Sequence, residues 1–140
     1  GNGYAAAIVA ETISGDLSLA LDRSRRPVPI DPAFSMTSAA ALAHAALLSS
    51  DREVMERALE WATQGSFVLL EFLSPFISCC RALLYGAFAE AADHAAEFWD
   101  DATAVPVWQV FALPLVRAAL VRAGRFDAAD DRCRSIRPSP

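Results

Sequence analysis

Apolar positions recur along the chain at the spacing of α-helices, and short corners interrupt them. After the corner at Gly124, apolar residues follow at Phe126, Ala129, Cys133 and Ile136, which is the spacing of a helix face. Gly124 suits a corner because, without a Cβ, it can adopt the left-handed conformation that closes a helix C-terminus. The pattern predicts that one helix ends at this glycine and another begins.

The same corner recurs upstream at Gly15, Ser50 and Gly86. The spacings between successive corners, ending with Gly124, are 35, 36 and 38 residues. A self-similar period of this length is typical of helical solenoids, in which each helix pair buries its face against the next pair. We therefore predict an all-α chain of about four antiparallel hairpins, or eight helices.

The helix bounds follow from the corners and the prolines. We expect helices at Tyr4–Ser14, Asp16–Ser24, Ser35–Ser49, from the Ser49–Asp51 corner to about Gln64, Ser66–Tyr85, from Gly86 to about Asp100, from about Pro106 to Ala123, and from Arg125 to about Arg137. The Pro-rich stretch from Arg25 to Pro32 predicts a linker between hairpins, because proline lacks an N–H donor.

Local signals refine these bounds. Asp16 is expected to cap the second helix, and Ser50 with Glu53 has the spacing of a capping box for the fourth. Pro75 and Pro114 fall inside apolar helices and are expected to kink them.

The two helices of the later hairpins differ in pattern. The first is apolar on nearly every side, as in a helix between neighbours, and the second is amphipathic, as in an outer helix. The apolar stripe of the helix after Gly86 consists of Phe88, Ala91, Ala92, Ala95, Phe98 and Trp99, and its polar side holds Glu90, Asp93, Glu97 and Asp100.

The corners resemble the tetratricopeptide repeat (TPR), whose second half has a small residue, Gly, a variable position, an aromatic, two variable positions and Ala. The matching positions are Gly86, Phe88 and Ala91, then Gly124, Phe126 and Ala129, and, with Leu in place of the aromatic, Gly15, Leu17 and Ala20. The first helices depart from that family, because they lack its Trp, Leu-Gly and Tyr spacing, and the Ser50 corner has an inserted residue or two. The resemblance implies a single right-handed α-solenoid domain over residues 1–140.

Ala- and Arg-rich degenerate repeats of this kind are similar to the helical region of large LuxR-type, MalT-like bacterial transcriptional regulators. That resemblance implies a cytoplasmic, non-catalytic sensing or protein-interaction segment in transcriptional control, with ATP and DNA sites elsewhere in the protein. The chain has no initiator Met and ends at Arg137-Pro138-Ser139-Pro140, so we expect it to be part of a longer polypeptide.

Composition narrows the partners. The chain has no Lys, and its net charge of -5 disfavours direct nucleic-acid contact. The most apolar run, Phe67 to Cys80, contains Glu71 and is too short to cross a bilayer. Three cysteines, two of them adjacent, fit neither a disulfide framework nor a C-x-x-C site, which favours a reducing cytoplasm.

Catalytic, cofactor and metal signals are weak. His44 and His94 have no carboxylate or Cys at metal-ligand spacing, and His44, among alanines, is expected in the core. Adjacent acids such as Asp130-Asp131 point about 100° apart on a helix and so do not form a catalytic dyad. There is no Gly-rich phosphate loop. We therefore expect neither an enzyme nor a bound cofactor or metal.

The resemblance to the TPR family implies a concave groove lined by residues three, six, ten and thirteen before each corner. In this chain these positions are Leu83, Cys80, Phe76 and Leu73, then Val121, Ala118, Pro114 and Phe111, with Leu47 and His44 from the second hairpin. The occupant implied is a protein or peptide segment, including another domain of the same chain. In the opposite interpretation these side chains only fill the core between helices.

Two further hypotheses remain open. A small apolar inducer could lie between the kinked helices, with Gln109, Arg117 and His44 as polar contacts. Because an isolated solenoid fragment lacks polar capping repeats, a homodimer through the terminal hairpins is also expected.

Overall fold

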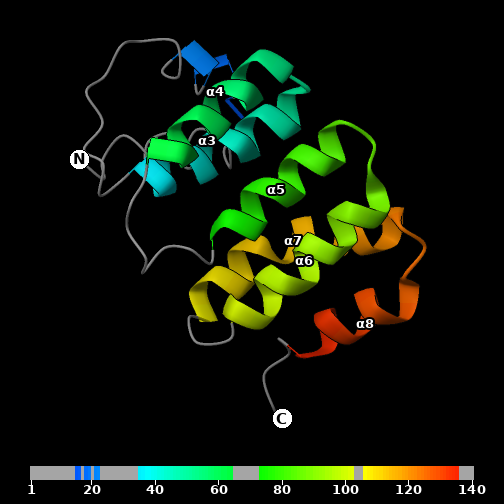
Figure 1. The fold of residues 1–140 in the computed structure, drawn as a ribbon. Helices are drawn as coiled ribbons and strands as arrows, with labels where there is room; N and C mark the ends of the chain where they lie inside the picture. Colours follow the sequence, from blue (N-terminus) through cyan, green and yellow to red (C-terminus); the bar gives the residue numbers. More distant parts are fainter. Residues whose placement is uncertain are drawn as a thin grey trace. The chain divides into compact units, whose positions relative to one another are not determined.

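The described part of the chain is entirely helices and the turns between them. The computed structural model describes residues 15, 16, 18, 19, 21, 22, 35–64, 73–102 and 106–135, and this part contains no strand. Its helices are α3 (Ser35–Ser49), α4 (Arg52–Gln64), α5 (Leu73–Leu84), α6 (Phe88–Ala102), α7 (Pro106–Arg122) and α8 (Phe126–Ser135) (Figure 1). The all-α prediction is confirmed.

The count of eight helices and the solenoid arrangement are not supported by these six helices. The expected helix at Tyr4–Ser14 and the linker from Arg25 to Pro32 lie outside the described residues, and only Ser18, Leu19, Leu21 and Asp22 represent the second expected helix. The expected kink at Pro75 involves the carbonyl of Glu71, which is also outside them. Pro114 does lie inside α7, where it cannot donate to the carbonyl of Val110.

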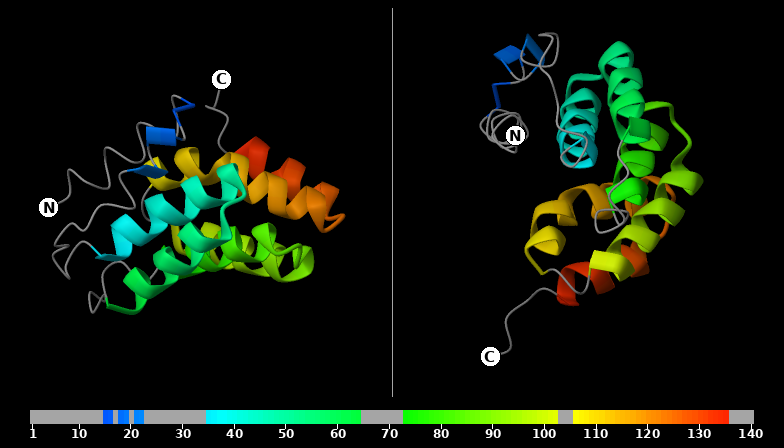
Figure 2. Two further views of the ribbon diagram at one scale, coloured as in Figure 1. Left: turned by 90° about the horizontal axis from the view of Figure 1, so that it is seen from above. Right: turned by 60° about the vertical axis from the view of Figure 1, so that its left-hand side comes forward.

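The chain divides into two compact units, Gly1–Ile77 and Ser78–Pro140, and the division falls within α5. In the first unit α3 packs against α4. In the second, α7 packs against both α6 and α8, and the views in Figure 2 show these neighbours side by side. The expectation of a single repeat domain stays a prediction.

The two helices of the first unit are buried in different ways. Seven apolar residues of α3 between Ala39 and Ala46 are at most 5% exposed, so this Ala-rich stretch is covered on every side, whereas Leu48 near the end of the helix is 52% exposed. In α4, Val54, Met55 and Ala58 are buried, while Glu56 and Glu60 are exposed. This contrast confirms the predicted pairing of an apolar helix with an amphipathic one.

The structure buries five of the six stripe residues predicted for α6, and the sixth, Phe88, is half-buried. Ala91, Ala92, Ala95, Phe98 and Trp99 are at most 5% exposed. The acidic residues on the other side of α6, which are Glu90, Asp93, Glu97 and Asp100, are all exposed. The facing core comes from Ala112, Leu115, Val116, Ala119 and Leu120 of α7 and Ala129 of α8.

Three corners share one hydrogen-bonded geometry, a Schellman motif. At the end of α3, the N–H of Ser50 donates to the carbonyl of Leu47 (3.2 Å) and the N–H of Asp51 to that of Ala46 (3.0 Å). The same pair of bonds forms at Gly86, with Leu83 and Ala82 as acceptors, and at Gly124, with Val121 and Leu120. These bonds satisfy carbonyl groups that the helix end leaves unpaired.

The next helix begins immediately after each corner. The carbonyls of Asp51, Ala87 and Arg125 accept the first helical hydrogen bonds of α4, α6 and α8, at 2.9 to 3.1 Å. One residue therefore closes the first helix, and the residue after it is already the N-cap of the second.

All four predicted corner residues adopt positive φ. The values are 86° for Gly15, 56° for Ser50, 80° for Gly86 and 78° for Gly124. Asp16 caps as predicted, because its Oδ1 accepts from the N–H of Leu19 at 3.3 Å. The predicted corner positions are confirmed in the backbone.

The capping box predicted from Ser50 and Glu53 is wrong. Ser50 has the left-handed φ that closes α3, whereas an N-cap residue needs an extended conformation. Asp51 is the N-cap instead, and its Oδ1 accepts from the N–H of Val54 at 3.1 Å. Glu53 then lies one position too early to complete a box.

We predict that Gly124→Ala lowers the free energy of unfolding by about 1 kcal/mol, because a Cβ disfavours the left-handed conformation. A Cβ at this position would have no atom within 4 Å, so the effect is conformational rather than steric crowding. Urea denaturation followed by circular dichroism measures it. Gly124→Asn is the control, since Asn tolerates this conformation better, and an equal loss in both variants would contradict the explanation.

Candidate binding face on α7

The groove residues predicted in the first unit are mostly enclosed. Leu73 is 0% exposed and Phe76 is 2% exposed, while His44 and Leu47 are partly buried. The ring of His44 meets that of Phe76 edge-on, with centroids 6.1 Å apart and an interplanar angle of 71°. A partner could contact Leu73 or Phe76 only if the helices around them separated.

Burial affects the protonation of His44. Removing the imidazole from water disfavours its charged form, so the pKa of His44 lies below its usual value of 6.5. The neutral ring is therefore the form that packs against Phe76. This is the environment of a core histidine, as the surrounding alanines predict.

We predict that the free energy of unfolding falls as the pH is lowered from 7.5 to 5.5. Below pH 6.5 the unfolded chain binds more protons at His44 than the folded chain does, so this contribution is fully present above pH 6.5 and is lost below it. Urea denaturation across this range measures the slope. His44→Gln should flatten it, whereas His94→Gln, on the outer side of α6, is the matched control; an unchanged slope in the His44 variant would contradict the prediction.

The groove residues predicted in the second unit are placed differently from one another. Cys80 is 0% exposed, Leu83 is partly buried and Val121 is 37% exposed. The side chains of Phe111 and Gln109 lie outside the described residues. Assignment of these residues to one groove therefore stays a prediction.

Cys79 and Cys80 are free, buried thiols. Burial raises the pKa of Cys79 to about 12. Burial also raises the pKa of Cys80 well above its usual value, and the neighbouring Cys79 adds to this, although a backbone hydrogen bond acts in the opposite direction. Because the thiolate is the reactive form, both groups have the character of small core residues.

We predict that a thiol reagent such as Ellman's reagent modifies Cys133 in the native protein and reaches Cys79 and Cys80 only after unfolding. Cys133 is partly exposed, whereas the other two are buried and have suppressed thiolate forms. The stoichiometry with and without denaturant measures this. Native Cys133→Ser protein should give almost no rapid reaction, and rapid modification of that variant would disprove the assignment.

A hollow lies on the exposed face of α7. It has a volume of about 320 Å³ and is lined by Pro114, Arg117, Ala118, Val121 and Arg122. Pro114, Ala118 and Val121 are three of the four groove positions predicted for this helix, and Arg117 is a predicted polar contact. All five side chains are exposed.

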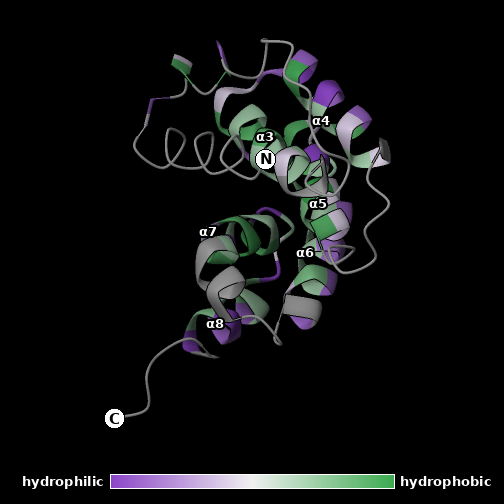
Figure 3. Cartoon of the chain, turned by 90° about the vertical axis from the view of Figure 1, so that its left-hand side faces the viewer, coloured by the Kyte–Doolittle hydropathy of each residue, from purple (hydrophilic) through white to green (hydrophobic). Residues whose placement is uncertain are grey.

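The exposure of this face differs from the covered position that the apolar pattern of α7 predicts, although a groove lined by these residues implies exposure. An apolar helix of this type is expected to be covered by neighbours on all sides. The opposite side of α7 is covered, with Ala112, Val116 and Ala119 buried, but the hollow remains open. Figure 3 shows the coloured part of α7 as largely hydrophobic. Part of an apolar helix is thus accessible to a partner.

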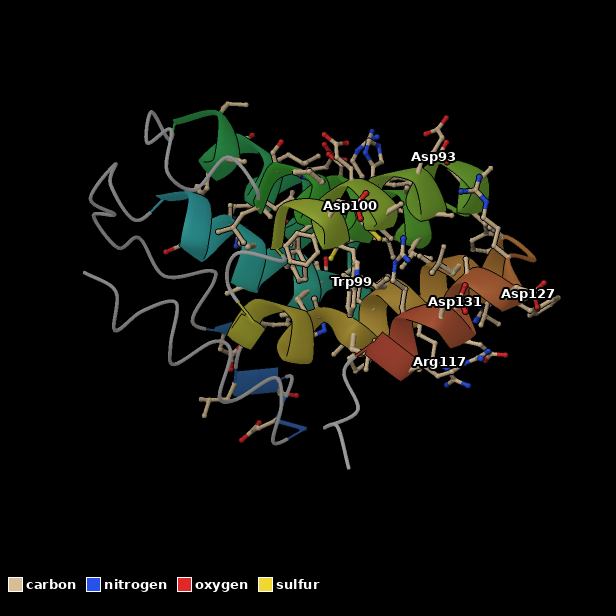
Figure 4. The ribbon with its side chains drawn as sticks, turned by 90° about the horizontal axis from the view of Figure 1, so that it is seen from below. Asp93, Trp99, Asp100, Arg117, Asp127 and Asp131 are labelled. Carbon is tan, nitrogen blue, oxygen red and sulfur yellow. The ribbon has the colours of Figure 1, made fainter. Side chains whose placement is uncertain are left out.

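The polar residues of this face are arginines. Arg122 lies over the ring of Phe88 from α6, 5.6 Å from its centroid. Just beyond the helix, Arg125 forms an ion pair with Asp93 at 2.8 Å, which links the start of α8 to α6. Arg117 lies on the far side of α7 from Asp93 and Asp100 (Figure 4).

Arg122 is not among the predicted groove residues. It stands four residues after Ala118, so helical spacing places it next to this groove position on the surface of α7. That spacing could have identified it.

Other kinds of site find no support in the described ranges. These residues contain no group of three or more His, Cys, Asp or Glu side chains that could hold a metal ion. None of their helices has both the length and the apolar character to cross a membrane. No protein-family model matches the chain, and no curated protein or solved structure does so either.

Proposed function

We propose that this chain is a non-catalytic protein-interaction segment that binds a protein partner through the exposed face of α7. The observation that carries the proposal is the open hollow on an otherwise apolar helix. Exposed apolar surface that is rimmed by polar groups is typical of interaction sites. The period of the corners supports a helical-repeat scaffold, an architecture that serves mainly as a binding surface.

The form of the hollow favours a protein over a small inducer. Small-molecule sites enclose most of their ligand and surround it with convergent polar groups. Here every described lining residue belongs to one helix and is exposed, so the described part of the surface is a helix face. A helix or extended segment laid along α7 fits such a face.

The wider setting that we propose is a larger bacterial regulator of the LuxR type. The similarity of the degenerate Ala- and Arg-rich repeats supports it. In that setting the chain would transmit a signal by binding a protein segment, and other domains would bind ATP and DNA. The partner could belong to the same polypeptide or to another protein.

Site-specific photo-crosslinking tests the proposal. A benzoylphenylalanine at Ala118, within the hollow, should crosslink a defined protein in extracts of the source cells. The same group at Ala89, an exposed alanine of α6, is the matched control and should not crosslink it.

Val121→Asp should reduce the Ala118 crosslink about tenfold, because it places a charge in the apolar centre of the contact. Val121 is 37% exposed, and circular dichroism should show a folded variant. The identified protein is then purified and its affinity for both chains measured. Identical crosslinks from Ala118 and Ala89, or none from Ala118, would reject the proposal.

A further inference from the structure

The face of α7 combines an apolar centre with positive charge on its edges. Pro114, Ala118 and Val121 form the centre, and Arg117 and Arg122 are the charged residues that line the hollow. No acidic side chain of the described residues lines it. Neither arginine forms an ion pair with another described residue, and Arg122 contacts the ring of Phe88 instead.

Apart from these two arginines, the second unit carries eight acidic residues and five arginines, so its net charge is negative. The exposed acids of α6 are Glu90, Asp93, Glu97 and Asp100, and those of α8 are Asp127, Asp130 and Asp131. The chain as a whole carries a net charge of -5. The α7 face is therefore a local positive site on an acidic protein, and it selects for negative charge in whatever binds there.

The charge argues against pairing of this face with itself. In a two-fold symmetric contact the same surface meets its own copy. Arg117 and Arg122 of both copies would then crowd into one small area, and like charges brought together in an interface are unfavourable. A contact of this kind leaves the guanidinium groups without acceptors.

The two arginines also suit carboxylates in particular. A guanidinium group can donate two parallel hydrogen bonds to one carboxylate. Arg122 is already held over the Phe88 ring, so less side-chain freedom is lost when it binds. Five residues of helix separate the two arginines by about 7.5 Å along the axis and about 140° around it, so they flank the apolar centre on opposite sides and suit acids on both edges of a partner helix.

We propose that the α7 face binds an acidic amphipathic helix. The helix would lay apolar side chains on Pro114, Ala118 and Val121, and its flanking Glu or Asp residues would pair with Arg117 and Arg122. This inference rests on the proposed function and adds the chemistry of the partner to it.

A pair of designed peptides tests the charge requirement on the whole chain. Both are fluorescein-labelled 16-residue helices with the same Leu stripe, and the flanking positions are Glu in one and Lys in the other. Fluorescence anisotropy should show that the chain binds the Glu peptide about tenfold more tightly, as expected for two partly exposed ion pairs. Raising the salt from 0.05 to 0.5 M should reduce the difference through screening.

Charge reversal provides the decisive comparison. The double variant Arg117→Glu, Arg122→Glu should prefer the Lys peptide. The control, Arg52→Glu with Arg134→Glu, changes the net charge by the same amount at two exposed arginines of α4 and α8 and should keep the preference for Glu. Circular dichroism should show that both variants are folded.

Three outcomes would overturn the inference. These are equal affinity for the two peptides, the same reversal in the control variant, and no binding of either peptide at 100 µM. Any of these peptide results rejects only the acidic helix as the partner. The proposed function still holds if the Ala118 crosslink is specific and is lost in Val121→Asp. Failure of that crosslink rejects the proposed function itself, so the two failures are distinguishable.

Discussion

The structure depends on single residues held in the left-handed conformation at the ends of helices. Each closes one helix with two backbone hydrogen bonds and leaves the following residue to begin the next helix. The turn is so short that the chain must reverse direction at once. Where glycine occupies the position, the conformation involves little steric strain; at Ser50 a Cβ is present, and the two backbone bonds hold the same geometry.

Two of these tight corners join helices that pack against each other. α3 reverses into α4, and α7 reverses into α8, so in each case the partner in the core is the helix next in sequence. Alanine allows the close contact that these hairpins require because its side chain is small, and its burial loses no side-chain entropy. The larger buried side chains, such as Phe98 and Met55, fill the remaining space between the helices.

The exposed face of α7 is one exception to this burial. A helix apolar on nearly all sides exposes Ala118 and Val121, although its opposite side is fully packed. Apolar area that stays in water does not contribute the favourable free energy of burial, which is about 25 cal/mol per Å². A partner that covers the face recovers that free energy, and the arginines at its edges restrict which partners can do so.

The sequence alone determined the local features of the chain. Helix bounds such as Ser35–Ser49, the buried stripe of α6 and the positive-φ corners depend on residues within a few positions of one another, and the observed structure agrees with them. The tertiary structure decided the features that depend on contacts with other helices. Asp51 replaces Ser50 as the N-cap because closing α3 already uses Ser50. Whether an apolar residue is covered, as Phe76 is, or open, as Val121 is, depends on helices packed beside it, which its own spacing does not reveal.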